Sequence, residues 1–305
     1  MENIIAPVDT ALLKQELAQA GELSGASHGD IKVFCLDSSF PHVLREIGRL
    51  REIAFRKGGG GSGKGCDLEQ WDTDPSFQFK QLVVWDERNE CIAGGYRFVY
   101  GNDVKTDAAG QPLIPSAHIF RFTESFMKGQ MPHTMELSRS FIAPGHQRTD
   151  SARKSVFVLD SLFKGICIMA REGGMSDVFG KVTFYPDYPP EAFSLLTAFM
   201  EKHCSDDKKE ITPFSQYPVP PAADAESILN SDDFQSDFRA LHSALLQRKL
   251  YLPPILKSYI KQSTTLRYYG SALNDAFGNV VEMGLRLHIP DLDKERWAVY
   301  FKKGK

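Results

Sequence analysis

The fold is decided by one stretch of the sequence, Met135-Glu136-Leu137-Ser138-Arg139-Ser140-Phe141-Ile142-Ala143-Pro144. Its apolar residues are typical of a strand that faces a core. Because strand side chains alternate, Glu136, Ser138 and Ser140 are expected on one face and the arginine among them on the other. A carboxylate in such a strand is costly unless it is paired or has a function. We therefore expect a site at a sheet edge or at a splay between strands, where Glu136 takes a proton from an attacking amine, directly or through water.

The composition argues against several classes of protein. With 305 residues and 42% hydrophobic content, the chain is long enough for one large domain or two modest ones. A net charge of -3 argues against a general nucleic-acid binder. No apolar run reaches membrane-spanning length, and residues 1–10 lack the pattern of a signal peptide. The five cysteines are far apart and odd in number, which indicates reduced thiols in a cytoplasm and no metal site.

Apolar periodicity predicts alternating helices and strands around the Glu136 strand. Helices are expected at residues 8–20, 41–54, 123–128, 155–171, 190–202, 234–251 and 255–262. Strands are expected at residues 31–36, 79–85, 91–100, 178–185, 264–269 and 280–289, with a loop at 101–116. Ser38 or Ser39 is expected to cap the second helix, and Gly94-Gly95 to mark a bulge. Strands joined as hairpins indicate an α+β or three-layer α/β fold rather than a doubly wound nucleotide-binding fold.

A glycine-rich loop follows the second helix. Its spacing, from Gly58 to Gly63-Lys64, is that of a phosphate-binding loop. However, Gly65 stands where a magnesium-binding Ser or Thr is required, and the loop follows a helix rather than a strand. The alternatives are a flexible loop and a mobile lid over an acidic ligand.

Charged residues near this loop allow two interpretations. Residues 66–74 carry four carboxylates, which fit either a solvated loop or an acidic pocket that holds an amine or arginines. Trp71 favours some burial. Arg97 lies inside a hydrophobic strand and is expected to have a carboxylate partner, in a structural ion pair or in a site. Arg51 alone would be an exposed helix residue.

Two later segments are basic. Residues 144–154 lead into a helix whose first amides could bind phosphate with Arg148, Arg153 and Lys154, unless the segment is an exposed polar loop. Residues 248–261 mix basic and apolar residues, as membrane-surface segments do. Core packing with the lysines outside explains the second segment equally well.

Five motifs in order carry a family resemblance. They are Arg51-Glu-Ile-Ala-Phe55; Gly63-Lys64 followed by Asp67, Glu69, Trp71 and Asp72; Gly94-Gly95-Tyr96-Arg97; Glu136-Leu-Ser-Arg139; and Leu252-Pro-Pro254-Ile-Leu-Lys257-Ser-Tyr259 with the later Asp275-Ala-Phe277-Gly278. Together they resemble GNAT-superfamily N-acyltransferases, especially the haemolysin-type enzymes of ornithine and glycine lipids. Acyl-homoserine-lactone synthases are a more distant resemblance.

The departures from the family pattern concern the acyl donor. The usual GNAT pyrophosphate loop is absent after the Glu136 strand, where Gly145 alone remains. This favours an acyl carrier protein, whose acidic surface would meet the basic residues, over acyl-CoA. Glu69 stands where lactone synthases usually have Asp.

The resemblance implies a GNAT-like mixed sheet flanked by helices and a division of the chain. The segments would be an N-terminal helical part (1–30), an acyltransferase core (31–203), a linker or excursion (204–232) and a C-terminal extension (233–305). The implied reaction moves a 3-hydroxy fatty acyl group from acyl carrier protein to an amino acid amine, the first step of aminolipid synthesis. No cofactor would be bound; the donor is the carrier's phosphopantetheine thioester, with acyl-CoA as the alternative. The enzyme would be cytoplasmic, with peripheral contact at the inner face of the membrane.

The resemblance also implies residue roles. The catalytic set is Glu136, Ser138, Arg139 and Tyr185, where Tyr185, or else Tyr188, protonates the leaving thiolate. The substrate-binding set is Arg51, Phe55, Glu69, Trp71, Asp72 and Arg97. The donor-binding set is Arg148, Arg153 and Lys154.

Three rival functions remain. A lactone synthase would use S-adenosylmethionine as the acceptor. A non-catalytic module would bind membranes or carrier protein, with Lys257 and Lys261 at the vesicle surface. A lytic membrane protein would need a spanning segment that the sequence lacks.

Overall fold

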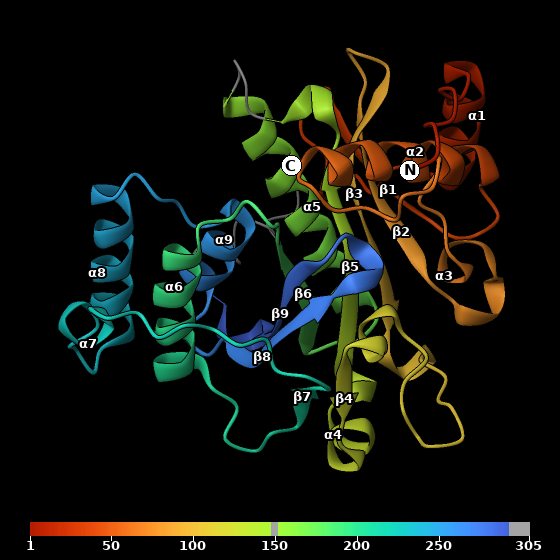
Figure 1. Ribbon diagram of the computed structural model, residues 1–305. Helices are drawn as coiled ribbons and strands as arrows, with labels where there is room; N and C mark the ends of the chain where they lie inside the picture. Colours follow the sequence, from red (N-terminus) through yellow and green to blue (C-terminus); the bar gives the residue numbers. More distant parts are fainter. Residues whose placement is uncertain (148–151, 293–305) are drawn as a thin grey trace.

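The fold is built on a seven-stranded mixed sheet (Figure 1). A computed structural model describes residues 1–147 and 152–292, with the backbone alone at 152–156. The strand order is β1-β2-β3-β5-β6-β9-β8. The strands are Ile31–Leu36 (β1), Lys80–Asp86 (β2), Cys91–Tyr100 (β3), Thr134–Ile142 (β5), Asp177–Phe184 (β6), Arg267–Asn274 (β8) and Val280–His288 (β9). Neighbours pair antiparallel except β5 and β6, which run parallel, so the predicted mixed sheet is confirmed.

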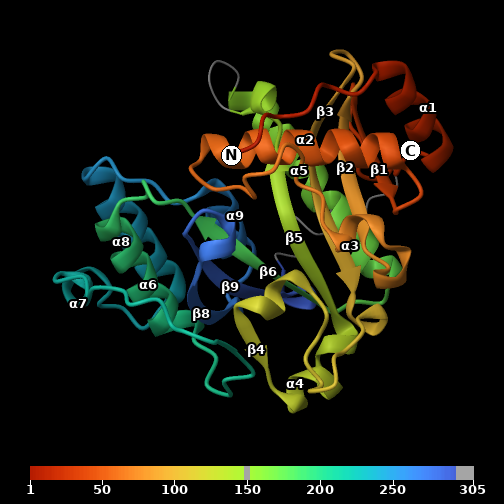
Figure 2. The ribbon, with the colours of Figure 1, turned by 45° about the vertical axis from the view of Figure 1, so that its right-hand side comes forward.

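Helices cover both faces of the sheet. They are Thr10–Ala20 (α1), Pro41–Lys57 (α2), Gln70–Thr73 (α3), Glu124–Gly129 (α4), Ala152–Glu172 (α5), Pro190–Cys204 (α6), Ala225–Ile228 (α7), Phe234–Gln247 (α8) and Pro254–Gln262 (α9). Short 3-10 turns lie at Pro75–Phe77, Gly101–Asp103, Pro115–His118, Met131–His133, Pro144–His146, Asp275–Phe277 and Ile289–Asp291. One face packs against α5, α6, α8 and α9, and the other against α1 and α2. Figure 2 shows α1 at the β1 end, α2 running across the strands as far as β5, and α6, α8 and α9 beside β8 and β9.

The start of α2 is capped from another helix. The predicted cap at Ser38 or Ser39 is wrong, because Phe40 holds the cap position and Ser39 instead hydrogen-bonds Asp37. The buried carboxylate of Glu16 on α1 accepts hydrogen bonds from the backbone amides of residues 42 and 43, at 3.1 and 2.8 Å. A negative charge at this end also suits the helix dipole. This long-range cap leaves no local sequence pattern.

A small second sheet joins two distant segments. It pairs Phe120–Phe122 (β4) with Ile211–Pro213 (β7), antiparallel. The first strand was not predicted, because three residues are too few for a periodic signal. The second lies in residues 204–232, and Leu229 of the same segment is buried in the core. The four-part division of the chain stays a prediction.

A bulge redirects side chains on β5. Gly95 pairs with Phe141 and Arg97 with Ser138, so that Arg139 and Ser140 together face one residue of β3. Arg139 has a φ of 53°, in the left-handed region. This bulge turns Arg139 to the face of Glu136, where it meets two carboxylates of the loop before α3. The expected alternation at residues 139 and 140 is therefore wrong, because the extra residue shifts the register by one.

The glycine-rich loop wraps around a carboxylate of its own chain. Glu52 on α2 is buried and accepts hydrogen bonds from the backbone amides of Ser62 and Gly63, at 2.9 and 2.8 Å. The Ser62 hydroxyl and Arg56 also donate to it. The loop amides that would cradle a phosphate are thus occupied by Glu52, in agreement with the missing Ser or Thr.

Replacing Glu52 with Gln tests this anchoring role. Loss of the charge weakens all four hydrogen bonds, so the free energy of unfolding should fall by about 2–3 kcal/mol. Denaturant titration measures the change, with Glu124→Gln at an exposed helix start as the control. Equal midpoints for the two variants would show that Glu52 does not anchor the loop.

Candidate active site

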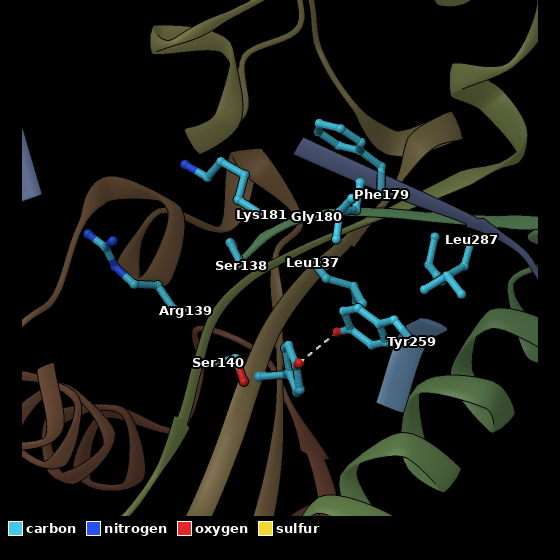
Figure 3. Close-up of a pocket in the computed structure, with 12 residues that line it drawn as sticks. Leu137, Ser138, Arg139, Ser140, Phe179, Gly180, Lys181, Tyr259 and Leu287 are labelled. Atoms are coloured by element: carbon cyan, nitrogen blue, oxygen red, sulfur yellow. Dashed lines mark hydrogen bonds between the residues drawn. The ribbon is translucent and has the colours of Figure 1, made fainter. Parts of the chain in front are cut away.

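The site begins where β5 and β6 separate. Their parallel pairing runs from Thr134 with Asp177 to Leu137 with Gly180, and ends there. A cavity of about 40 Å³ opens between the strands beyond this point. In Figure 3, Lys181 and Arg139 extend to one side of the sheet, whereas Leu137 and Tyr259 lie on the other. The predicted splay is confirmed.

Two larger cavities adjoin this splay cavity. One of them, called the groove below, lies between α5 and α9 and measures about 270 Å³. It shares Tyr96 and Tyr259 with the splay cavity, and their hydroxyls hydrogen-bond at 3.0 Å (Figure 3). The polar cavity lies largely on the opposite face and measures about 240 Å³; it shares Ser138, Arg139 and Lys181 with the splay cavity and Ile255 with the groove. Shared lining residues thus connect the three cavities.

Next to the polar cavity lies a buried ion network centred on Asp72. Its carboxylate accepts hydrogen bonds from Arg51 at 2.8 Å and from Arg97 at 2.9 Å, and all three side chains are fully buried. Gln81 bridges the network by accepting from Arg51 and donating to Asp72. The predicted carboxylate partner of Arg97 is confirmed. Arg51 is buried rather than exposed, because its aliphatic helix neighbours pack on the sheet and carry it inward.

The network continues to the bulge on β5. Glu69 accepts a hydrogen bond from Arg97 at 2.8 Å and pairs with Arg139 at 2.9 Å. Arg139 also lies 3.0 Å from Asp67, and its guanidinium covers the ring of Phe277 at 4.5 Å. Three arginines thus face three carboxylates, and the acidic segment serves to hold arginines in place.

Burial and ion pairing shift these carboxyl groups in opposite directions. Burial acts to raise the pKa of Asp72, but Arg51 and Arg97 outweigh it and hold that pKa well below its usual range. Glu69 follows the same pattern: burial raises its pKa, and Arg139 and Arg97 bring it below the usual value. Burial wins at Asp67, whose pKa is raised despite Arg139. Asp72 is therefore the permanent charge of the network.

Glu136 is buried two residues before Ser138 of the polar cavity and has one oxygen unused. Its Oε1 accepts a hydrogen bond from the buried Ser116 at 2.8 Å, and its Oε2 has no hydrogen-bond partner among the described residues. Burial raises its pKa, although Ser116 and Arg97 act against the shift. Ser138, on the same face, accepts from Arg97 at 3.1 Å and lines the polar cavity. Its hydroxyl hydrogen is thereby left to point toward Glu136 or toward a ligand.

Tyr185 lies at the edge of the polar cavity. Burial raises its pKa to about 12, and Glu282 adds to the shift. Its ring packs so closely on the glycine loop that a Cβ at Gly58 or Gly60 would lie within 2.9 Å of it. Tyr188 is placed differently, since its hydroxyl donates to the carbonyl of Tyr251 and it lines another cavity. Of the two tyrosines, Tyr185 is the one at the site.

The other predicted residues vary in their position. Phe55 lines the polar cavity and packs edge-on against Phe277 at 5.1 Å. Trp71 donates to the carbonyl of Leu113 and lies beside Arg97, 5.7 Å from its guanidinium carbon, away from the cavity. Arg148 lies outside the described residues. So do the side chains of Arg153 and Lys154 at the start of α5.

Sequence reasoning missed two charged residues in the polar cavity. Lys181 on β6 and Glu282 on β9 pair with each other at 2.5 Å and both line it. Each sits in an ordinary alternating strand, so the sequence holds no local signal for them. The cross-strand register that brings them together is visible in the structure alone.

Comparisons with known proteins bear on the same residues. Residues 50–156 match the acetyltransferase (GNAT) domain family. A glycine N(alpha)-acyltransferase of Phocaeicola vulgatus is 37% identical over 97% of this chain and 91% of its own length. One from Bacteroides thetaiotaomicron is 35% identical over 97% and 88%.

The chain belongs to the GNAT N-acyltransferases. The predicted family, fold class and enzyme class are confirmed. Among solved structures, this N-acyltransferase is similar to FeeM, an N-acyl amino acid synthase from uncultured soil microbes, with 9% identity, coverage of 86% and 91%, and a TM-score of 0.43. In the described part of the N-acyltransferase, no helix is both long and apolar enough to cross a membrane.

The central carboxylate of the network can be tested for stability. Asp72→Asn leaves the buried guanidinium of Arg51 without its charge partner and that of Arg97 with Glu69 alone, so the free energy of unfolding should fall by about 3–5 kcal/mol. Asp74→Asn, at an exposed aspartate two residues away, is the matched control.

The pH dependence of the free energy of unfolding, compared between the wild type and Asp72→Asn, tests the same charge. Folding lowers the pKa of Asp72, so its contribution is present above the unfolded pKa of about 3.9 and is lost as pH falls further. The stability gap between wild type and Asp72→Asn should narrow below about pH 4. A constant gap measured by denaturant titration would contradict the charge role of Asp72.

Proposed function

We propose that this enzyme transfers a 3-hydroxy fatty acyl group from acyl carrier protein to the amine of glycine. The product, an N-acyl amino acid, would begin the synthesis of an aminolipid. One observation carries the proposal: a buried carboxylate with a free oxygen, Glu136, lies one residue before the end of the parallel pairing and two residues before Ser138, which lines the polar cavity. The relatives' names supply glycine as the acceptor.

The three cavities support a separate place for each substrate. The phosphopantetheine arm would enter along the groove between α5 and α9, with the thioester in the splay cavity. Beyond Leu137, β5 has no strand partner on its β6 side among the described residues, so its amides there can hold the oxyanion. The amino acid would approach from the polar cavity on the opposite face. Donor and acceptor then meet beside Ser138.

Proton transfers complete the reaction. Glu136, through Ser138 or a water, takes a proton from the ammonium group, and its raised pKa makes it a stronger base than an exposed carboxylate. The amine nitrogen bonds to the thioester carbon and releases its second proton to water, and the carbon–sulfur bond then breaks. Tyr185 is protonated at neutral pH and gives its proton to the leaving thiolate.

The ion network positions these groups rather than reacting. Arg97 joins Asp72 to Ser138, so it fixes the hydroxyl next to the base. Glu69 and Arg139 hold the bulge that opens the cavity. Arg51 donates a hydrogen bond to Asp72, and Trp71 lies beside Arg97. Phe55 forms an apolar wall of the polar cavity.

Donor choice follows from charge. The basic residues of the segment 148–154, which are Arg148, Arg153 and Lys154, would receive the acidic surface of the carrier protein. The enzyme would act in the cytoplasm, with peripheral membrane contact near the long-chain product.

One assay separates the possible reactions. Purified enzyme is incubated with 3-hydroxypalmitoyl carrier protein or the matching acyl-CoA, and with a pool of amino acids or S-adenosylmethionine. Mass spectrometry of extracted lipid should show N-acylglycine from the carrier-protein donor. Acyl-homoserine lactone from S-adenosylmethionine, or no acyl transfer, would contradict the proposal.

The role of Glu136 makes a separate prediction. Glu136→Gln should abolish turnover while thermal unfolding stays cooperative, because the amide cannot accept the proton. In the wild type, kcat/KM for the amine should fall as pH drops through the raised pKa of Glu136, above the range of an exposed glutamate. Glu124→Gln is the matched control. An active, folded Glu136→Gln enzyme would remove Glu136 from the role of base.

A further inference from the structure

Two charged side chains of the polar cavity have no role in the mechanism above. Lys181 and Glu282 extend from adjacent strands, and their Nζ and Oε2 atoms lie 2.5 Å apart. The side chains are 10% and 5% exposed, yet both line the polar cavity. Figure 3 shows Lys181 on the same side of the sheet as Arg139. The pair is shielded from bulk solvent but open to a ligand in the cavity.

Stability of the fold does not explain this pair. The desolvation of two buried charges offsets much of their attraction, and apolar residues of similar size often replace such pairs without loss. Glu282 Oε2 contacts the lysine but makes no directed hydrogen bond among the described residues. The carboxylate therefore keeps the capacity to accept hydrogen bonds from a ligand.

We propose that Lys181 and Glu282 bind the two charged ends of the free amino acid acceptor. This inference rests on the proposed function. Lys181 pairs with the acceptor carboxylate and Glu282 with its ammonium group. A zwitterion has no net charge, as the pair has none, so its entry exchanges one ion pair within the protein for two with the ligand. The pair thus selects an α-amino acid over a simple amine, which lacks the carboxylate.

The neighbouring cations already pair with carboxylates of the protein. Arg139 is the other cation that lines the cavity among the described residues, and Asp67 and Glu69 hold it. Arg51 and Arg97 are fully buried and bind Asp72. Lys181 differs from these arginines, because its partner Glu282 can itself bind the ligand.

The position of the pair suits the chemistry. Burial dominates the pKa of both Glu136 and Tyr185, and nearby charges also act on them: Lys181 on Glu136 and Glu282 on Tyr185. The pair lines the same cavity as Tyr185 and Ser138, so an amino acid held by it lies beside the proposed acid and next to the hydroxyl that leads to the proposed base. Its amine is presented to the splay cavity, where the thioester carbon would sit.

A crossed experiment tests each end of the acceptor. Wild type, Lys181→Met and Glu282→Gln are assayed with saturating acyl carrier protein donor and varied glycine or glycinamide, which lacks the carboxylate. Lys181→Met should raise KM for glycine about 10- to 100-fold and leave KM for glycinamide unchanged or lower. Glu282→Gln should raise KM for both acceptors, since both carry the amine. KM for the donor should stay constant throughout.

Controls keep the result specific. Lys128→Met removes a lysine from an exposed ion pair and should match the wild type. Lys181→Arg keeps the charge and should recover much of the glycine affinity, and Lys181→Gln replaces the Met variant if that variant does not fold. Equal effects of Lys181→Met on glycine and glycinamide, or unchanged KM for glycine, would overturn the assignment.

The inference and the proposed function can fail separately. If the wild type transfers no acyl group to any amino acid, the proposed function fails. Calorimetric titration of glycine and glycinamide then decides the inference alone. Glycine binding that Lys181→Met abolishes supports the pair as a receptor, whereas equal or absent binding in both proteins overturns it.

Discussion

The rest of the structure depends on the buried carboxylate of Asp72 and the two guanidinium groups that hold it. Each of these charges would be costly alone in the interior, so each requires the others. They come from three elements: Arg51 from α2, Asp72 from the short α3, and Arg97 from β3. Since each pairing joins two of these elements, the network fixes α2 and the acidic segment against the centre of the sheet. The geometry of the candidate site is thereby tied to the stability of the fold.

The same network leaves Glu136 in a different state from Asp72. Arg51 and Arg97 are oriented by Asp72, and Arg139 by Asp67 and Glu69. Glu136 therefore has a neutral serine as its recorded hydrogen-bond partner, and burial raises its pKa while that of Asp72 is lowered. When two environments shift the pKa values of two carboxyl groups in opposite directions, one site can hold both a permanent charge and a base. The difference follows from where the arginines point.

Sequence patterns predicted what is local and missed what depends on register. The strand at Ile31–Leu36 is predicted to the residue, because apolar period and turn residues agree there. The strand that contains Glu136, and its splay, could be predicted because a buried carboxylate is costly unless it is paired or has a function. The faces of Arg139 and Ser140 could not be predicted, because one extra residue against β3 reverses them. Glu282 could not be predicted because its importance comes from β9 lying beside β6.

The wall of the polar cavity comes from two parts of the chain. The recognised GNAT domain, residues 50–156, contains the ion network and Glu136. Much of the polar cavity wall lies beyond it: Lys181 and Tyr185 on one strand and its end, then Pro253, Phe277 and Glu282 from the tail. A strand pair that completes a sheet must bury one face, and here its other contribution is to close one side of the polar cavity. Residues 50–156 thus hold the carboxylate that we propose as the base, whereas α5, β6 and the C-terminal segment build most of the two cavities that we propose for the donor and the acceptor.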